Sequence, residues 1–241
     1  MNTNEVADRR EQIARSLRSV NGEVAAACSA ANRKPEDVRL IAVTKNFPAS
    51  DVVHLASLGV SDIGENRDQE ASSKAAEVGL SAQVRWHFVG TLQRNKAKSV
   101  AAYADMVQSV DRGRLVTALG TAARGADRLL EVLIQVSLDG DVERGGATVE
   151  DVPGLAQSIL EESALSLRGV MAVAPLGWEP ARAFDMLAET SEQLRSIAPQ
   201  ANEISAGMST DFHEAIACGA TMIRLGSKLL GHRRNVGYPV R

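Results

Sequence analysis

Leu130-Glu-Val-Leu-Ile-Gln-Val136 is a short apolar run rich in β-branched residues, which is typical of a buried strand. After it, Thr148-Val-Glu-Asp151 carries polar residues that commonly start a helix. The same alternation recurs along the chain. We expect strands at residues 39–44, 62–64, 84–88, 106–110, 130–136, 165–172, 201–205 and 221–225. Eight strands, each followed by a helix, predict an α/β fold of the (β/α)8 TIM-barrel type.

An open doubly wound sheet stays the alternative architecture, because periodicity alone does not distinguish it from a closed barrel. The length of 241 residues is close to the roughly 250 that is typical of a barrel, and no shift in composition divides the chain. We therefore expect a single domain over residues 1–241. Residues 1–34 are expected to contain an extra N-terminal helix, with an apolar stripe formed by Val6, Ile13, Leu17, Val20 and Val24.

Composition limits the partners of the chain. A formal net charge of −3 gives no general attraction to nucleic acid or to an anionic membrane, and no apolar run reaches the roughly 18 residues of a membrane span. Cys28 and Cys218 match neither a metal-binding nor a disulfide spacing. We expect a cytoplasmic protein without a metal site, and a monomer, with a dimer as the alternative.

Aromatic residues make up 3% of the chain, so aliphatic and methionine side chains should fill the interior.

Lys45 stands at the carboxyl end of the first expected strand, where barrels place their binding groups. An amine attacks an aldehyde only when it is unprotonated, and a partly desolvated barrel mouth favours that form. Lys45 is therefore a candidate for imine formation. The alternative is a surface lysine that covers a strand end or pairs with a carboxylate.

The loops after the last two strands could bind a phosphate. Gly207-Met-Ser-Thr210 follows the seventh strand, and Arg224-Leu-Gly-Ser227 ends the eighth. Ser209 and Ser227 could donate hydroxyl groups, and Gly226 would allow a close approach of the main chain. The alternative is that the glycines serve tight turns and that Ser209 caps a helix.

Three more residues at strand ends are ambiguous from the sequence. Arg224 lies in an apolar strand, where it could form a salt bridge within the barrel or donate to the pyridine nitrogen of a cofactor. His87 could be a hydrogen-bonded packing residue or a contact of the ligand. Asn66 could start a helix or face the site.

Taken together, the chain resembles the pyridoxal phosphate homeostasis proteins, whose barrel is similar to the N-terminal domain of alanine racemase. The resemblance covers about residues 40–233. Its landmarks are Ala42-Val-Thr-Lys45, Gly64-Glu-Asn66 with Gln69-Glu70, His87-Phe-Val-Gly90 with Leu92-Gln93 and Asn95-Lys96, Ser109-Val-Asp111, Gly207-Met-Ser209 with Asp211, and Arg224-Leu-Gly226.

The resemblance implies pyridoxal 5'-phosphate (PLP) as the ligand. It implies that Lys45 forms the Schiff base, that Arg224 is the partner of the pyridine nitrogen, and that the phosphate is held by Ser209, Gly226 and Ser227. Asn66, Met208 and His87 complete the expected contacts. Arg67 stands where many relatives have tyrosine, so contacts beside Asn66 are expected to differ.

Intracellular PLP (vitamin B6) homeostasis and cofactor carriage is the function that this resemblance implies, with PLP-dependent apoenzymes as possible partners. A racemase of small amino acids is the alternative, but racemisation needs an acid or base on each face of the substrate. The only tyrosines are Tyr103, in an expected helix, and Tyr238, near the carboxyl end. Neither has an evident place opposite Lys45. A barrel that binds another phosphorylated ligand without an imine is a third possibility.

Overall fold

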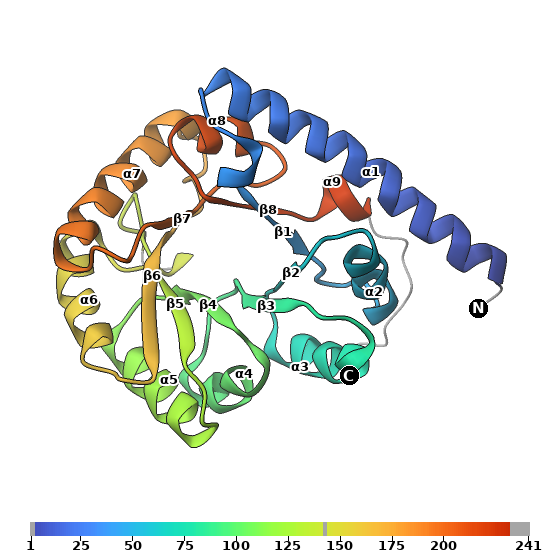
Figure 1. Cartoon of the computed structure of the whole chain (residues 1–241). Coiled ribbons are helices and arrows are strands. Elements are labelled where there is room, and N and C mark those ends of the chain that lie inside the picture. The colour runs from blue at the N-terminus through green and yellow to red at the C-terminus, as the bar shows by residue number, and fades with distance from the viewer. Residues whose placement is uncertain (1–2, 142–143, 232–241) are drawn as a thin grey trace.

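A closed barrel of eight parallel strands forms the centre of the computed structural model, which describes residues 3–141 and 144–231 (Figure 1). The strands are β1 (Arg39–Val43), β2 (Asp62–Glu65), β3 (Arg85–Phe88), β4 (Met106–Val110), β5 (Leu130–Gln135), β6 (Leu165–Met171), β7 (Glu203–Ser205) and β8 (Met222–Leu225). Each pairs with its neighbour in chain order, and β8 closes the barrel on β1 with Ile41 opposite Arg224. The predicted TIM barrel is confirmed, and the open sheet is wrong.

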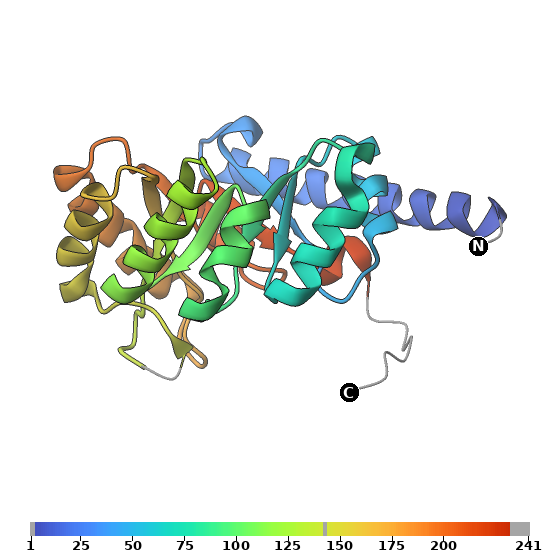
Figure 2. The same cartoon turned by 90° about the horizontal axis from the view of Figure 1, so that it is seen from below.

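Helices surround the barrel as an outer layer (Figures 1 and 2). Those in the described residues are α1 (Thr3–Ala30), α2 (Ala49–Ser57), α3 (Asp68–Val78), α4 (Ala97–Tyr103), α5 (Gly113–Gly125), α6 (Val152–Leu160), α7 (Pro180–Ile197), α8 (Phe212–Ala217) and α9 (Ser227–Leu230). The predicted helix start at 148–151 corresponds to a short 3-10 turn, Val149–Asp151, that leads into α6. None of these helices is long and apolar enough to cross a lipid bilayer.

The extra helix at the amino terminus is α1, which packs against α2, α8 and α9 outside the ring of barrel helices (Figure 1). Four residues of its predicted stripe are buried, namely Ile13, Leu17, Val20 and Val24. The side chain of Val6 lies outside the described residues. Arg9 anchors the helix through an ion pair of 2.6 Å with the buried Asp51.

Inside the barrel, side chains form layers because alternate residues of each strand point inward. One layer is apolar and consists of Ile41, Met106, Leu133, Met171 and Met222. It confirms the expected aliphatic and methionine interior.

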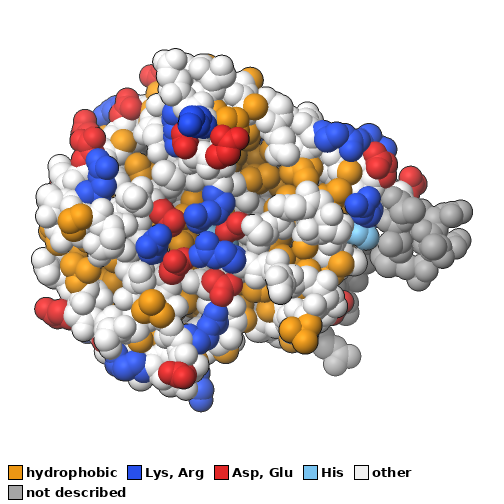
Figure 3. Space-filling view, viewed as in Figure 1, with side chains coloured by type: hydrophobic (Ala, Val, Ile, Leu, Met, Phe, Trp, Pro, Cys, Tyr) orange, Lys and Arg blue, Asp and Glu red, His pale blue; other side chains and the backbone are white. Residues whose placement is uncertain are grey.

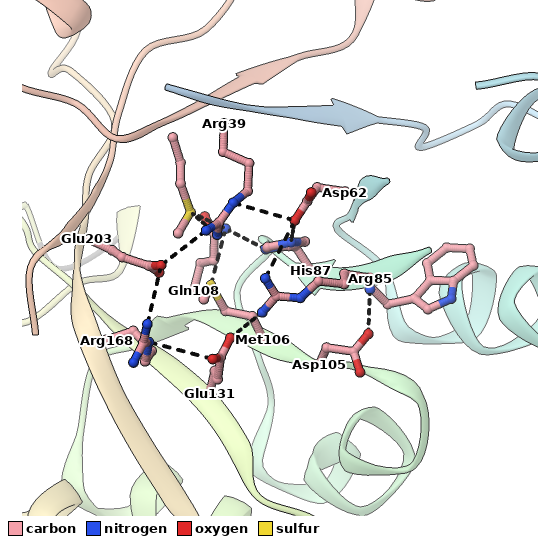
Figure 4. A network of polar contacts seen from close by, with 12 residues as sticks. Arg39, Asp62, Arg85, His87, Asp105, Met106, Gln108, Glu131, Arg168 and Glu203 are labelled. Carbon is pink, nitrogen blue, oxygen red and sulfur yellow. Dashed lines mark hydrogen bonds and ion pairs between the residues drawn. The ribbon is translucent and has the colours of Figure 1, made fainter. Parts of the chain in front are cut away.

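A ring of alternating charges covers the amino ends of the strands (Figures 3 and 4). Its members, in order around the barrel, are Arg39, Asp62, Arg85, Glu131, Arg168 and Glu203. Each contacts two neighbours of opposite charge, with distances from 3.4 Å between Arg39 and Glu203 to 4.0 Å between Arg39 and Asp62, and an ion pair joins Arg85 and Glu131. The amino-terminal mouth is thus occupied by paired charges, whereas the predicted ligand groups Lys45, Ser209 and Ser227 follow the carboxyl ends of their strands.

Candidate functional site

Lys45 lies at the carboxyl-terminal mouth, two residues beyond the end of β1. Its side chain is exposed, and no hydrogen bond or ion pair holds its amine within the described residues. The alternative in which Lys45 pairs with a carboxylate therefore does not fit the structure. The unpaired amine at the mouth is accessible to an aldehyde, and its exposure differs from the partly desolvated position that the sequence led us to expect.

The loop after β8 approaches the end of β1 closely. Ala42 pairs with Leu225, and a Cβ atom built on Gly226 would lie 3.1 Å from the carbonyl oxygen of Val43. This explains why glycine suits position 226. It also brings the predicted anion site to the strand that carries Lys45.

The two predicted phosphate loops meet through their serines. The Ser227 hydroxyl donates to Ser209 Oγ over 3.2 Å, so the segments after β7 and β8 form one polar surface at the mouth. Gly207 adopts a left-handed φ of 89°, and a Cβ atom there would lie 2.8 Å from the Cα atom of Phe212. The loop therefore needs glycine for both conformation and space. Beside it, the partly exposed Met208 donates its backbone N–H to Asp211 Oδ1 over 2.6 Å.

Arg224 is 5% exposed and extends into the barrel, where both of its hydrogen-bond partners are neutral. Its Nη1 atom donates to Ser205 Oγ over 2.7 Å and its Nη2 atom to the Ala172 carbonyl over 2.8 Å. Burial lowers the pKa of Arg224 to about 10, against the opposing effect of Asp211. The guanidinium stays protonated near neutral pH and forms no salt bridge with a described residue, so it can donate to a ligand.

A chain of hydrogen bonds continues from Arg224 through the barrel. Ser205 Oγ donates to Gln108 Oε1 over 2.7 Å, and Gln108 Nε2 lies 3.0 Å from His87 Nδ1. His87 Nε2 lies in turn 2.8 Å from Asp62 Oδ1 (Figure 4). With a neutral His87 protonated on Nε2, every donor points from Arg224 towards Asp62. Burial raises the pKa of Asp62, but the hydrogen bonds from His87 and Ser61, together with the positive charge of Arg39, outweigh it and hold this pKa below its usual value.

His87 is thus placed beneath the mouth rather than in it, with 1% of its surface exposed. Its predicted direct contact with a cofactor is not supported by this placement, because both ring nitrogens already have partners. The hydrogen-bonded packing residue, which the sequence left as the alternative, describes the geometry. His87 reaches Arg224 through Gln108 and Ser205.

Three buried polar atoms near the carboxyl ends of β2 and β4 have no hydrogen-bond partner among the described residues. They are Glu65 Oε2, at the end of β2, Asn66 Oδ1, just after it, and Ser109 Oγ, in β4. Buried polar atoms normally have a hydrogen-bond partner, so these atoms indicate a ligand or water in this region. Gly90 packs against Asn66, since a Cβ atom at position 90 would overlap the Asn66 carbonyl oxygen. Together with the Arg224 guanidinium and the hydroxyls of Ser209 and Ser227, which can donate hydrogen bonds, these groups fit a small, polar, anionic ligand.

Sequence reasoning missed Gln108 and Ser205 as parts of the site. Both lie at inward positions of their strands and are fully buried. The available signal was a polar residue inside an otherwise apolar strand, as in Met106-Val-Gln-Ser-Val110. Such residues are buried only when they have partners.

This chain is similar to known proteins over most of its length. The family model of the alanine racemase N-terminal domain matches residues 23–234. A pyridoxal phosphate homeostasis protein from Mycobacterium bovis is 42% identical over 94% of this chain and 95% of its own length. The protein of the same name from Escherichia coli is 34% identical over 92% of this chain and 97% of its own length.

Solved structures are also similar. PipY from Synechococcus elongatus with PLP bound is 34% identical and has a TM-score of 0.74, over 86% of this chain and all of PipY. An alanine racemase from Corynebacterium glutamicum shares the fold, with a TM-score of 0.66 at 12% identity, but this chain covers only 64% of it.

Proposed function

This chain belongs to the alanine racemase N-terminal domain family and, within it, to the pyridoxal phosphate homeostasis proteins, and from that membership we propose that it holds PLP as a Schiff base on Lys45. Its function is PLP binding in homeostasis and carriage of the cofactor. The observation that supports this most directly is the Lys45 amine, which is unpaired among the described residues and follows β1, the strand that pairs with β8 beside the Ser209–Ser227 surface.

Each end of the ligand has a group suited to it. Bound PLP supplies an aldehyde, which the Lys45 amine can hold covalently. The hydroxyl groups of Ser209 and Ser227, with the backbone at Gly226, receive the phosphate. Arg224, held by Ser205, would donate to the pyridine nitrogen and keep it unprotonated, which would make the ring a poorer electron sink and favour carriage over turnover. Asn66 would contact the ring.

In this proposal Met208 borders the phosphate, and His87 acts on Arg224 through the hydrogen-bond chain. PLP-dependent apoenzymes in the cytoplasm are the proposed recipients. The monomeric state stays a prediction.

Racemisation is the second candidate function, favoured only by the shared fold. It requires an acid or base opposite Lys45. Tyr103 closes α4 in the outer helix layer, and its hydroxyl is buried without a partner. Burial raises the pKa of that hydroxyl, as do the charges of Asp68 and Glu65, so Tyr103 is unsuited to proton transfer. Tyr238 lies outside the described residues.

Borohydride reduction of the purified protein loaded with PLP, followed by peptide mapping, tests the covalent link. A pyridoxyl adduct is expected on the peptide that contains Lys45. The Lys45→Arg variant keeps the positive charge and should give no adduct at this position. An unmodified Lys45 in the wild-type protein would refute the Schiff base.

The racemase alternative is tested separately with single-enantiomer alanine or serine. Incubation with the PLP-loaded protein should leave the enantiomer unchanged. Appreciable formation of the mirror image would overturn the assignment to carriage.

A further inference from the structure

The backbone around Lys45 forms a tight turn between β1 and α2. Phe47 donates its N–H to the Thr44 carbonyl over 3.0 Å, and Asn46 adopts a left-handed φ of 66°. Asparagine adopts this conformation more readily than most residues other than glycine, so position 46 suits the turn. Because the direction of the Lys45 side chain follows from this turn, whatever fixes the turn also aims the amine.

Two side chains of α3 hold the peptide groups on both sides of Lys45. Lys74 Nζ donates to the Thr44 carbonyl over 2.8 Å, and the Asn46 N–H donates to Glu70 Oε1. Glu70 and Lys74 are one helical turn apart and form an ion pair of 3.2 Å. Glu70 and Lys74, on one face of α3, therefore hold the turn by hydrogen bonds on both sides of Lys45.

Glu65 completes this cluster from the end of β2. It is fully buried, forms an ion pair of 2.5 Å with Lys74, and accepts a hydrogen bond of 2.6 Å from the Thr44 hydroxyl. Lys74 is itself only 5% exposed. Burial raises the pKa of Glu65, against the opposing effect of the Lys74 charge. Charge-assisted hydrogen bonds in a desolvated place are short and directional, so the cluster is suited to fixing a backbone geometry.

A buried ion pair adds little net stability compared with apolar packing, so stability alone does not explain the cluster. What distinguishes it is the target of its hydrogen bonds, which are the peptide groups that flank one exposed amine. We propose that Glu70 and Lys74 are positioning residues, which hold the turn so that the Lys45 amine meets an incoming aldehyde. This inference rests on the proposed function and deepens it.

The first experiment mixes the full-length protein with PLP and follows imine formation by its visible absorbance. Glu70→Ala removes the acceptor of the Asn46 N–H and should slow imine formation about 10-fold, since small displacements of a reacting group have effects of this size or larger. Glu70→Gln keeps an oxygen acceptor and should restore the rate to within about 2-fold of wild type. Glu77→Ala, an exposed position on the same helix, is the matched control and should leave the rate unchanged.

Binding of pyridoxine 5'-phosphate, which lacks the aldehyde, separates positioning from assembly of the site. Its affinity should be the same in all three variants and in wild type. A wild-type imine rate in Glu70→Ala would overturn the inference, as would an equal loss of pyridoxine phosphate affinity. If the wild-type protein itself forms no imine, the proposed function fails, which is a distinct result.

Lys74 is tested in a background that removes both buried charges. The double variant Glu65→Gln with Lys74→Met avoids leaving a lone charge in the interior. It should also slow imine formation about 10-fold while pyridoxine phosphate still binds. If its imine rate equals that of wild type, Lys74 does not position the amine. Should this protein not fold, the Glu70 series alone decides.

Discussion

Replacing Ser205 by alanine interrupts the hydrogen-bond chain beneath the cofactor site. Ser205 is completely buried, accepts a hydrogen bond of 2.7 Å from Arg224 and donates one of 2.7 Å to Gln108. Losing an acceptor of a charged donor costs about 1.5–3 kcal/mol, and leaving the amide oxygen of Gln108 unpaired adds about 1 kcal/mol or more. The Ser205→Ala variant should therefore be less stable than wild type by about 2.5–4 kcal/mol.

Urea unfolding of the ligand-free protein measures this loss as a shift of the midpoint with an unchanged slope. Ser196→Ala is the control, because the Ser196 hydroxyl is exposed and bonds only within its own helix. Its stability should stay within about 0.5 kcal/mol of wild type. A loss below about 1 kcal/mol in Ser205→Ala would refute the idea that Arg224 depends on this hydroxyl.

A double-mutant cycle adds a second criterion. Once Gln108 is replaced by leucine, Ser205→Ala no longer leaves an amide oxygen unpaired. Its additional cost should then fall by about 1 kcal/mol. Strictly additive effects would show that Ser205 and Gln108 act independently, contrary to the chain described above.

Two further predictions concern the phosphate loop and the amino-terminal mouth. Gly207→Ala should destabilise the protein more than Gly219→Ala, because both glycines have left-handed backbones but only position 207 lacks space, with Phe212 Cα at 2.8 Å. Thermal unfolding should show a loss of stability of about 1–2 kcal/mol for Gly219→Ala and a loss about 1–3 kcal/mol larger for Gly207→Ala. Equal losses in the two variants would contradict the close approach of Phe212 to position 207. For Asp62, whose folded-state pKa lies below its usual value, the stabilising contribution is present above the unfolded pKa of about 3.9 and is lost as the pH falls through the folded pKa. The stability difference between wild type and Asp62→Asn should therefore shrink as urea unfolding is repeated from about pH 6 to about pH 3, and a constant difference would refute the assignment.

Much of the site could be expected from the sequence because function in a barrel gathers where strands end. Lys45, Ser209 and Ser227 all lie at such ends, and the structure brings their strands together. The placement of His87 could not be predicted. The sequence correctly placed His87 in a strand, but whether its imidazole faces a ligand or a buried carboxylate depends on residues of other strands.

The alternation of short apolar strands with helices determined an α/β fold of eight strand–helix units by itself, since side-chain direction along a strand repeats every two residues and is a local property. That the sheet closes into a barrel was decided by the pairing of β8 with β1, which the periodicity does not encode. Only the tertiary structure decided which polar groups meet. Ser205 and Gln108 are 97 residues apart in sequence, and Lys74 lies 30 residues after the Thr44 carbonyl that it holds. Closure of the barrel makes such pairs neighbours, because it places inward side chains of distant strands in one layer, and the packing of α3 beside β2 brings it to the turn of the preceding unit.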